Sequence, residues 1–401
     1  MHSRSIAMTK PSPPPSSSQP SRIDSTTLPD VDDVKDWIRA KACELGFADC
    51  GFLSVHHPLF AEQTQALKAW LNQGLYGTLD FMHDNHELRA NPHQLVDGAK
   101  TIISVRMDYL HTLPAPRRIE DNERPNHAII ARYARGRDYH KTVRQQLKKL
   151  ARAIESELPN WTHLSIGADK PFVFRPFSDS APIFERPIAD AAGLGWTGKH
   201  TLLINRQAGS FFNLGELFIS LDLMGDTESH PVKVHCGSCT ACIDICPTQA
   251  IIAPHTLDAG ACISYLTIEH KGSIDVKYRK AIGNRIFGCD DCQLICPWNR
   301  YAKIATVADY APRHGLDEVR LLDVWAWDED EFMAKTEGSP LRRTGYLNLL
   351  RNTAIALGNS QPDDTAKIDT ITALQSRLGM DAMLDEHIYW AIDELTAAHD
   401  A

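Results

Sequence analysis

The stretch of sequence that decides the fold is Cys236-Gly-Ser-Cys239-Thr-Ala-Cys242-Ile-Asp-Ile-Cys246-Pro247. A related stretch, Cys289-Asp-Asp-Cys292-Gln-Leu-Ile-Cys296-Pro297, follows it, and Cys262 lies between the two. Three thiolates at C-x-x-C-x-x-C spacing can ligate one 4Fe-4S cluster, and the cysteine before the proline ligates the other cluster in two-cluster proteins. The spacing therefore predicts two 4Fe-4S clusters in a bacterial-ferredoxin-like segment.

Eight of the ten cysteines lie between positions 236 and 296 and divide into two complete sets of four. The predicted ligands of the first cluster are Cys236, Cys239, Cys242 and Cys296, and those of the second are Cys246, Cys262, Cys289 and Cys292. A pair of structural zinc sites is the alternative, because C-x-x-C pairs also bind zinc. We prefer the clusters, since the triple run ending in Cys-Pro is more specific. Cys43 and Cys50 are expected to be buried thiols without a ligand role.

The 401-residue chain has a globular composition, with 43% hydrophobic and 23% charged residues. Its 42 basic and 51 acidic side chains give a formal charge of −9, which excludes a uniformly basic, nucleic-acid-coating surface. No apolar run approaches the ~18–20 residues that span a bilayer, so no membrane partner is expected. Residues 1–29 are a Pro/Ser-rich tail that we expect to be disordered, and they lack the apolar core of an export signal. We therefore expect a cytoplasmic location, where clustered cysteines bind metals.

Apolar periodicity divides the rest of the chain into three predicted parts. Helical and strand patterns alternate over residues 30–225, the cysteine-rich part covers 226–310, and residues 311–401 look like a short helical, HEAT-like region. Asp32 or Asp33 is expected to cap the first helix. The predicted helices of the first part cover about 34–45, 61–71 and 139–158, and its predicted strands 47–55, 101–107 and 127–133. The fold class is therefore α/β, of the α+β kind, with a mixed-sheet domain.

Several stretches outside the clusters narrow the choice of function. They are Gly136-Arg-Asp-Tyr-His-Lys141, Ser178-Asp-Ser-Ala-Pro-Ile-Phe-Glu-Arg186, Gly193-Leu-Gly-Trp-Thr-Gly-Lys199, Cys262-Ile-Ser-Tyr-Leu-Thr267 and Gly288-Cys-Asp-Asp-Cys-Gln-Leu-Ile-Cys-Pro-Trp-Asn299. In their order and spacing around the cysteines, these stretches closely resemble the epoxyqueuosine reductase family, over about residues 31–395.

The resemblance implies a cobalamin-dependent oxidoreductase of queuosine biosynthesis. Such an enzyme reduces epoxyqueuosine to queuosine in the anticodon loop of tRNA, with electrons passed through two 4Fe-4S clusters to cobalamin. It also implies that residues 30–225 form the cobalamin-binding catalytic domain. The expected partners are tRNA and an electron donor of flavodoxin or ferredoxin type, and we expect the chain to be a monomer.

Removal of an epoxide oxygen needs a proton donor, and the resemblance assigns this role to Asp179. The family has a V-D-S/T motif here, and Ser178 replaces its valine. Burial against an apolar face would raise the pKa of this carboxyl group, as a proton donor requires. The alternative is that Asp179 caps a helix that begins at Ala181.

The resemblance also indicates which residues contact cobalamin. Arg89 matches a family arginine whose guanidinium suits amide and phosphate oxygens, and the alternative is a solvated arginine at a helix end. Less direct contacts are implied for Ala131, Leu203, Leu214, Ser264 and Asp290, with Asp291 also close to the corrin. Ala131 departs from members that have cysteine there, which weakens a side-chain role at that position.

Two other motifs suggest a different catalytic acid and a different reaction. Asp138 is a rival acid, but neighbouring cations would lower its pKa, and we expect it to be structural or to orient the substrate. The stretch from Gly193 to Lys199 resembles a phosphate-binding loop, but His200 stands where that motif needs Ser or Thr, which argues against nucleotide hydrolysis.

A basic segment could bind tRNA despite the acidic total. Residues 131–152 contain eight Lys or Arg side chains and one Asp, a net charge of +7, and such a stripe can neutralise several phosphates; a solvated basic helix is the alternative. Further basic candidates are Arg342, Arg343, Arg351, Lys271 and Lys277, and the aromatic candidates for a base pocket are Trp196, Tyr265 and Trp298.

Two other functions remain open at this point. One is a corrinoid reductase acting on a small molecule, like the reductive dehalogenases. The other is an electron-transfer module without a substrate, although the roughly 200 residues that precede the clusters exceed what a carrier needs.

Overall fold

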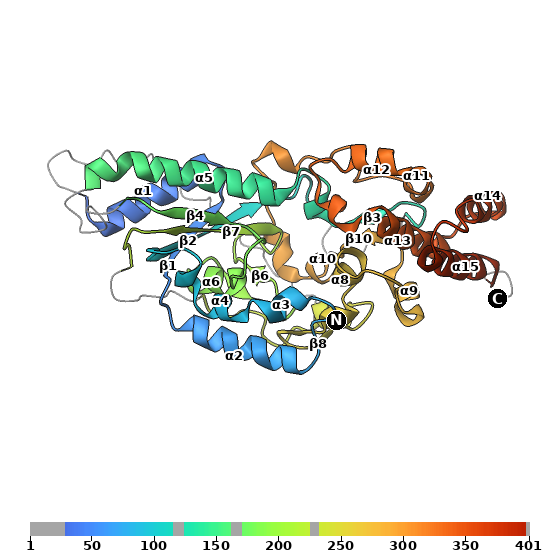
Figure 1. The fold of residues 1–401 in the computed structure, drawn as a ribbon, viewed down its shortest axis with the longest axis horizontal. Helices are drawn as coiled ribbons and strands as arrows, with labels where there is room; N and C mark the ends of the chain where they lie inside the picture. Colours follow the sequence, from blue (N-terminus) through green and yellow to red (C-terminus); the bar gives the residue numbers. More distant parts are fainter. Residues whose placement is uncertain (1–28, 115–123, 162–170, 225–231, 398–401) are drawn as a thin grey trace, which may run out of the picture.

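The computed structural model describes residues 29–114, 124–161, 171–224 and 232–397. The molecule is elongated, with the sheet unit at one end, the cysteine-rich segment in the middle and the last helices at the other end (Figure 1). The predicted tail lies, up to residue 28, outside the described residues, and so does the predicted boundary at 225–226. Within the described ranges, no helix is long and apolar enough to cross a membrane.

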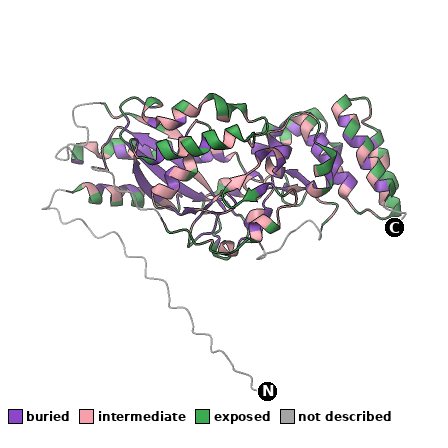
Figure 2. Ribbon diagram, turned by 90° about the horizontal axis from the view of Figure 1, so that it is seen from below, coloured by how far each residue is buried: buried purple, intermediate pink, exposed green. Residues whose placement is uncertain are grey.

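A four-stranded antiparallel sheet forms the first unit. Its strand order is β1 (Asp49–Ser54), β2 (Thr101–Asp108), β7 (Phe212–Ile219) and β4 (Phe174–Phe177). The two central strands are almost entirely buried, because helices cover both faces of the sheet (Figures 1 and 2). The fold class is thus the predicted α+β arrangement, with each face of the sheet sealed by its own apolar core.

The helices on the two faces follow from their apolar stripes. Helices α1 (Val31–Glu44) and α5 (Tyr139–Glu157) pack on one face, and α2 (Leu59–Asn72) and α6 (Glu185–Ala191) on the other. The expected cap of α1 was wrong, because Asp30 is the N-cap and forms a capping box with Asp33. Short helices α3 (Asp80–Asp84) and α4 (His86–Ala90) continue from α2.

The cysteine-rich segment is joined to the sheet unit by strand pairing. Its helices and strands are α7 (Ala241–Asp244), β8 (Ile251–Ala253), β9 (Thr256–Leu257), α8 (Ile263–Ile268), α9 (Val276–Ile282), β10 (Arg285–Phe287) and α10 (Asp291–Leu294). Strand β10 pairs in parallel with β3 (Ile129–Ile130). The predicted strand 127–133 is therefore too long, since a 3-10 turn begins at Arg132. Another short pair is β5 (Trp196–Thr197) with β6 (Leu203–Ile204).

The C-terminal part is helical, as predicted. It contains α11 (Leu321–Ala326), α12 (Glu329–Lys335), α13 (Tyr346–Asn359), α14 (Asp364–Gln375) and α15 (Ala382–Ala397). Helix α13 is its centre and packs against α11, α15 and β10. The C-terminal helices therefore rest directly on the cysteine-rich segment.

Arg351 corrects one expectation about the basic surface. Its side chain on α13 is fully buried and donates hydrogen bonds to the carbonyl oxygens of Leu266, His270 and Gly272. These carbonyls belong to α8 and the loop after it. Arg351 is therefore a structural tie between α13 and α8 and is not available to tRNA.

We expect Arg351→Met to lower the free energy of unfolding by about 3 kcal/mol, because three buried carbonyl groups lose a charged donor. Chemical denaturation followed by circular dichroism measures the change. Lys277→Met on α9 is the matched control, since Lys277 is 63% exposed and its loss should change stability by less than about 0.5 kcal/mol. Equal stability of the two variants would contradict the structural role of Arg351.

Candidate functional site

A large open cavity lies where the sheet unit, the cysteine-rich segment and the C-terminal part meet. Its volume is about 1690 Å³, which exceeds the roughly 300–1,000 Å³ of ordinary small-molecule pockets. Helix α2, the loop between β4 and α6, the start of α5, helix α8 and residues 338–343 contribute its walls. Of the predicted site residues, Arg89, Asp179 and Ser264 line it.

Arg89 is a buried cation in the wall of this cavity. It lies on α4, is 5% exposed, and donates through Nη1 to the Phe81 carbonyl oxygen at 3.3 Å. Burial lowers the pKa of its guanidinium. No carboxylate forms a salt bridge with it among the described residues. The alternative of a solvated helix-end arginine is therefore wrong, and the guanidinium is placed to bind an oxygen-rich ligand.

Asp179 projects into the same cavity from the loop after β4. Its backbone has φ 47°, a conformation that non-glycine residues adopt at a cost in energy. Tyr139 Oη donates to Asp179 Oδ2 at 2.5 Å, and the Asp179 amide donates to Glu185 Oε1 at 2.5 Å. The side chain is 62% exposed, toward the cavity. Because α6 begins at Glu185, the alternative that Asp179 caps a helix from Ala181 is wrong.

The charge of Asp179 is controlled by His140. His140 Nε2 lies 3.6 Å from Asp179 Oδ2, and His140 Nδ1 lies 2.7 Å from Asp138 Oδ1. The two carboxylates outweigh burial and raise the pKa of His140 to about 9. Desolvation within the cavity acts to raise the pKa of Asp179, but the nearby His140 imidazolium and the hydrogen bond from Tyr139 outweigh it and hold this pKa below its ordinary value. The expected raised pKa is thus wrong, and the proton rests on His140.

Asp138 has the structural role that the sequence predicted. Its side chain accepts from the His140 amide at 3.1 Å and so caps the start of α5. Burial would raise its pKa, but the hydrogen bonds and charge of His140 lower it. Asp138 therefore stays ionised and orients the imidazole toward Asp179.

Four other predicted site residues have their side chains packed elsewhere in the protein and not in the cavity. Leu203 and Leu214 pack in a small apolar cluster with Ala189. Ala131 is buried, and it packs closely against Gly288: a Cβ added at position 288 would lie 2.6 Å from the Ala131 Cβ. Asp290 accepts from the Arg132 amide at 2.9 Å and from Arg132 Nη1 at 3.2 Å. Among the described residues, none of these four side chains lines the cavity.

Thiols of each predicted set act on one another, and no group of three or more Cys, His, Asp or Glu side chains among the described residues has the arrangement of a formed metal site. Burial and the neighbouring Cys236, Cys242 and Cys239 raise the pKa of Cys296 to about 11, which joins a distant cysteine to the first motif. In the second set, burial and then Cys246 raise the pKa of Cys262. Burial and then Cys262, with further contributions from Cys242 and Cys246, raise the pKa of Cys292. Because thiolates repel one another, such groupings need metal charge to become deprotonated, and they suit two adjacent clusters.

The two sets differ in their surroundings. Cys262 directly precedes α8, whose Ser264 and Tyr265 line the cavity, so the second set lies beside it. Cys239 in the first set is exposed. Lys199 Nζ donates to the carbonyl oxygens of Gly237 at 2.7 Å and Cys239 at 2.9 Å, so it braces this loop. Of the two remaining cysteines, Cys50 is buried as expected, but Cys43 is exposed, contrary to the expectation.

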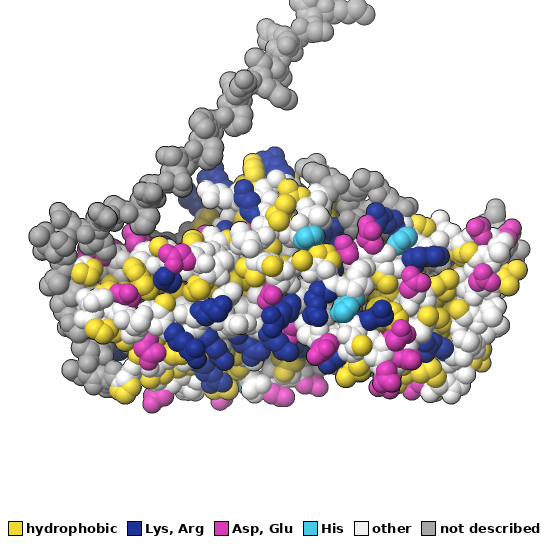
Figure 3. All heavy atoms as spheres, turned by 90° about the horizontal axis from the view of Figure 1, so that it is seen from above, with side chains coloured by type: hydrophobic (Ala, Val, Ile, Leu, Met, Phe, Trp, Pro, Cys, Tyr) yellow, Lys and Arg dark blue, Asp and Glu magenta, His cyan; other side chains and the backbone are white. Residues whose placement is uncertain are grey.

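The basic segment lies along α5, at the edge of the cavity. Lys141 and Arg144 line the cavity, and Figure 3 shows Lys and Arg side chains gathered across the face seen from above. Arg343 also lines the cavity and pairs with Glu269 at 2.6 Å. Of the aromatic candidates, only Tyr265 lines the cavity. Trp196 is fully buried in the core and packs edge-on against Trp298, which is partly buried.

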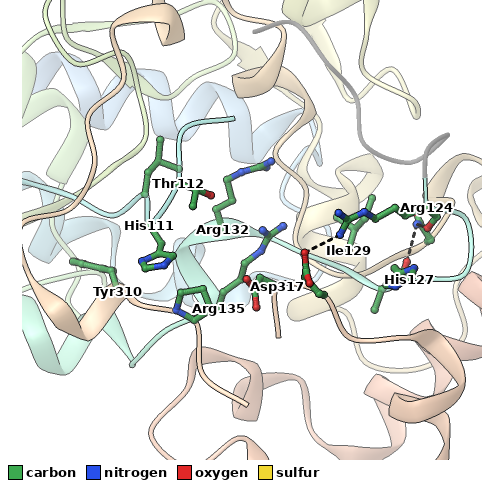
Figure 4. A pocket seen from close by; sticks show the side chains of 14 residues that line it. His111, Thr112, Arg124, His127, Ile129, Arg132, Arg135, Tyr310 and Asp317 are labelled. Carbon is green, nitrogen blue, oxygen red and sulfur yellow. Dashed lines mark hydrogen bonds and ion pairs between the residues drawn. The ribbon is translucent and has the colours of Figure 1, made fainter. Parts of the chain in front are cut away.

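A second, smaller cavity of about 280 Å³ contains none of the predicted catalytic or thiol residues. Its basic side chains already have partners, as Figure 4 shows for Arg124, whose Nη1 lies 3.2 Å from Glu318 Oε1. Arg132 pairs with Asp290, and Arg135 Nε donates to the Ile130 carbonyl oxygen at 2.8 Å. The large cavity is therefore the candidate active site.

The sequence arguments missed two residues of this site. Tyr139 and Glu185 hold the side chain and the amide of Asp179, respectively. Both stand in motifs that were singled out, Arg137-Asp-Tyr-His140 and Phe184-Glu-Arg186. Their contact with position 179 depends on the turn after β4, which no spacing rule predicts.

Comparisons with known proteins agree with this geometry. A family model described as "Epoxyqueuosine reductase QueG, DUF1730" matches residues 89–180, and one described as "4Fe-4S double cluster binding domain" matches residues 235–299. The epoxyqueuosine reductase of Escherichia coli (strain K12) is 47% identical over 363 residues, which is 90% of each chain. That of Pseudomonas aeruginosa is 46% identical and covers 90% of this chain and 92% of its own.

Solved structures show the same fold. Epoxyqueuosine reductase from Streptococcus thermophilus matches with a TM-score of 0.75 at 29% identity, over 91% of both chains. The Bacillus subtilis enzyme, described with its aspartate-bearing catalytic loop swung out of the active site, matches with a TM-score of 0.75 at 26% identity, again over 91% of both chains.

The pairing of His140 with two carboxylates predicts an imidazole that titrates near pH 9. Because the folded pKa is raised above the ordinary 6.5, the pairing stabilises the fold fully below about pH 6.5, and this contribution is lost as the pH rises through about 9. Asp138→Asn should lower the midpoint by at least about one unit. Histidine-selective NMR measures it, with His140→Gln to assign the resonance. A midpoint near 6.5 in the unsubstituted protein would contradict the pairing.

Proposed function

The chain belongs to the epoxyqueuosine reductase family, and we propose that its large cavity is where cobalamin and the modified nucleotide meet. The enzyme is an oxidoreductase that reduces epoxyqueuosine in tRNA to queuosine, and its family uses cobalamin and two 4Fe-4S clusters. The observation that carries the assignment of the site is that Asp179, Arg89 and Ser264 line one cavity beside the second thiol set.

The residues of the cavity suit a large, amide-rich ligand such as cobalamin. Apolar side chains of α2 and α3, including Leu67 and Phe81, form one wall, and the Arg89 guanidinium and the Ser264 hydroxyl supply polar groups. Leu203 and Leu214 pack with Ala189 of α6, the helix whose first residues line the cavity, and we propose Ala131, Leu203, Leu214 and Asp290 as indirect supports of the ligand. When bound and reduced, cobalamin supplies a strongly nucleophilic cobalt. The protein residues hold it, exclude water and supply protons.

The two thiol sets are the ligands that we assign to the clusters, with Cys296 completing the first set and Cys246 the second. Bound clusters supply one-electron transfer between the protein surface and the cavity. The exposure of Cys239 places the first set toward an external donor. We assign this role to a carrier of flavodoxin or ferredoxin type.

Asp179 is the proton donor in this proposal, together with His140. Loss of the epoxide oxygen as water consumes protons, and Asp179 is the carboxyl group that faces the cavity with a proton source at 3.6 Å. Tyr139 fixes the carboxylate, and Asp138 fixes the imidazole. The catalytic aspartate loop of the Bacillus subtilis enzyme is known in a swung-out position, which agrees with placing the donor on a loop.

The tRNA contacts that we propose follow the basic side chains around the cavity. The α5 side chains extend from Lys141 at the cavity edge to Arg152, and Arg342 and Arg343 also line the cavity. Phosphate contacts of this kind weaken steeply with salt. We further infer a monomer that acts in the cytoplasm, where its tRNA substrate is found.

Asp179→Asn should lower turnover of epoxyqueuosine-containing tRNA at least ~100-fold, because the amide carries no transferable proton. Product nucleosides are measured by mass spectrometry, with cobalamin and a chemical reductant supplied. Absorption spectra should show that the variant binds both cofactors normally.

Asp190→Asn is the matched control for this variant, since Asp190 also lines the cavity but accepts from the Thr197 amide at 2.9 Å, a bond that asparagine keeps. It should retain most of the activity. Activity of Asp179→Asn like that of the unsubstituted enzyme would exclude Asp179 as donor, and absence of queuosine from the fully loaded enzyme would overturn the function.

A further inference from the structure

Two glutamates beneath the Asp179 loop have no role in the chemistry described so far. Glu216 stands on β7 opposite Ser104 of β2, is fully buried, and accepts from Ser104 Oγ at 3.3 Å. Glu185 is the first residue of α6, lines the cavity, and accepts from the Asp179 amide at 2.5 Å. The second carboxyl oxygen of Glu216 is buried without a hydrogen-bond partner among the described residues.

The surroundings of this pair favour neutral carboxyl groups. Glu185 and Glu216 interact with each other, and Asp179 adds a third carboxylate on the same side. The charge of His140 lowers the pKa of Glu185, the guanidinium of the adjacent Arg186 also interacts with Glu185, and no Lys or Arg forms a salt bridge with either glutamate in the described part of the chain. Burial followed by the Asp179 charge raises the pKa of Glu185 to about 8, and burial raises that of Glu216 further. At neutral pH the pair therefore holds protons.

The reaction needs more protons than the donor pair stores. Conversion of an epoxide to an alkene breaks two C–O bonds, takes up two electrons and two protons, and releases one water molecule. The electrons come from the one-electron carrier and the protons from the protein. Asp179 and His140 hold one proton between them at neutral pH, because the pKa of His140 is raised and that of Asp179 is lowered. A second proton has to reach the departing oxygen within the same turnover.

We propose that Glu185, backed by Glu216, is the source of this second proton. The inference rests on the proposed function of Asp179. After the first proton has moved to the departing oxygen, the O–H bond of Glu185 breaks and its proton passes through the shared cavity to Asp179, which delivers it to complete the water molecule. Glu216 stabilises the neutral form of Glu185, and water in the open cavity returns a proton to Glu185 after each turnover.

Glu185 also holds Asp179 in place, so the two roles have to be separated. Its Oε1 accepts from the amide of a residue at positive φ, and that bond stabilises the loop. Glutamine keeps an acceptor oxygen at the same position but carries no acidic proton. Alanine removes both. Comparison of Glu185→Gln with Glu185→Ala therefore distinguishes a proton source from a positioning residue.

The experiment measures kcat for epoxyqueuosine-containing tRNA from pH 6 to pH 10. Glu185→Gln should lower kcat at neutral pH at least ~10-fold, as removal of a proton-transfer group does. Its profile should lose the decline through about pH 8 and keep only the decline near 9 that follows His140. Glu185→Ala should resemble Glu185→Gln. Glu62→Gln on the exposed start of α2 is the control and should behave like the unsubstituted enzyme.

An independent readout does not depend on turnover. The infrared carbonyl band of a protonated carboxyl group, identified by its shift in heavy water, should be present at pH 7 and reduced in Glu185→Gln and in Glu216→Gln. If one of the two variants fails to fold, the band in the other variant and in the unsubstituted protein still shows whether this pair holds a proton at pH 7.

The outcomes separate this inference from the proposed function. If Asp179→Asn is inactive while Glu185→Gln keeps the unsubstituted kcat and pH profile, the proton source is overturned and the function of Asp179 stands. If Glu185→Gln is normal and only Glu185→Ala is impaired, Glu185 only positions Asp179. Activity of Asp179→Asn overturns the proposed donor itself.

Discussion

The return of the chain that brings Cys296 beside the motif beginning at Cys236 organises the whole molecule. The cysteine-rich segment folds back until α10 packs against α7. The return places β10 beside β3 and Ile304 beside Leu110, which attaches the segment to the sheet unit. It also leaves α8 in the wall of the cavity. The same return therefore places Cys262, which directly precedes α8, beside the cavity.

Features that depend on local spacing could be predicted from the sequence. The two cysteine runs beginning at Cys236 and Cys289, the main helices of the first unit and strands β1 and β2 follow from patterns within a few residues of one another. The cap of α1 and the short β3 were mispredicted because boundaries depend on single contacts, such as the Asp30–Asp33 capping box. Arg351 was mispredicted for a different reason. Its partners on the loop after α8 lie about eighty positions earlier, and only the packing of α13 brings them together.

The active site shows the same limit in its electrostatics. Burial alone would raise the pKa of Asp179, and nothing in the sequence indicates a lowered value. In the fold, the start of α5 meets the loop after β4 across forty positions, and His140 and Tyr139 both turn toward the carboxylate. In the proposed mechanism the acid is then a property of the pair, since Asp179 faces the cavity and His140 holds the proton. A residue whose charge depends on such contacts cannot be assigned from its own neighbours in sequence.

Glu216 shows how far the sheet itself takes part in the chemistry. A carboxyl group in the middle of a central strand, with one oxygen unpaired, is less stable there than an apolar side chain of similar size. Burial of this carboxyl group is compatible with a stable sheet only in its neutral, protonated form. The neighbouring carboxyl groups, and not the packing of the sheet, therefore account for a glutamate at this position. Ser104 on the adjacent strand supplies its one hydrogen bond, so two central strands together maintain the group. The sheet that carries the Asp179 loop thus also holds a protonated carboxyl group next to that loop, close to the site of a reaction that takes up two protons.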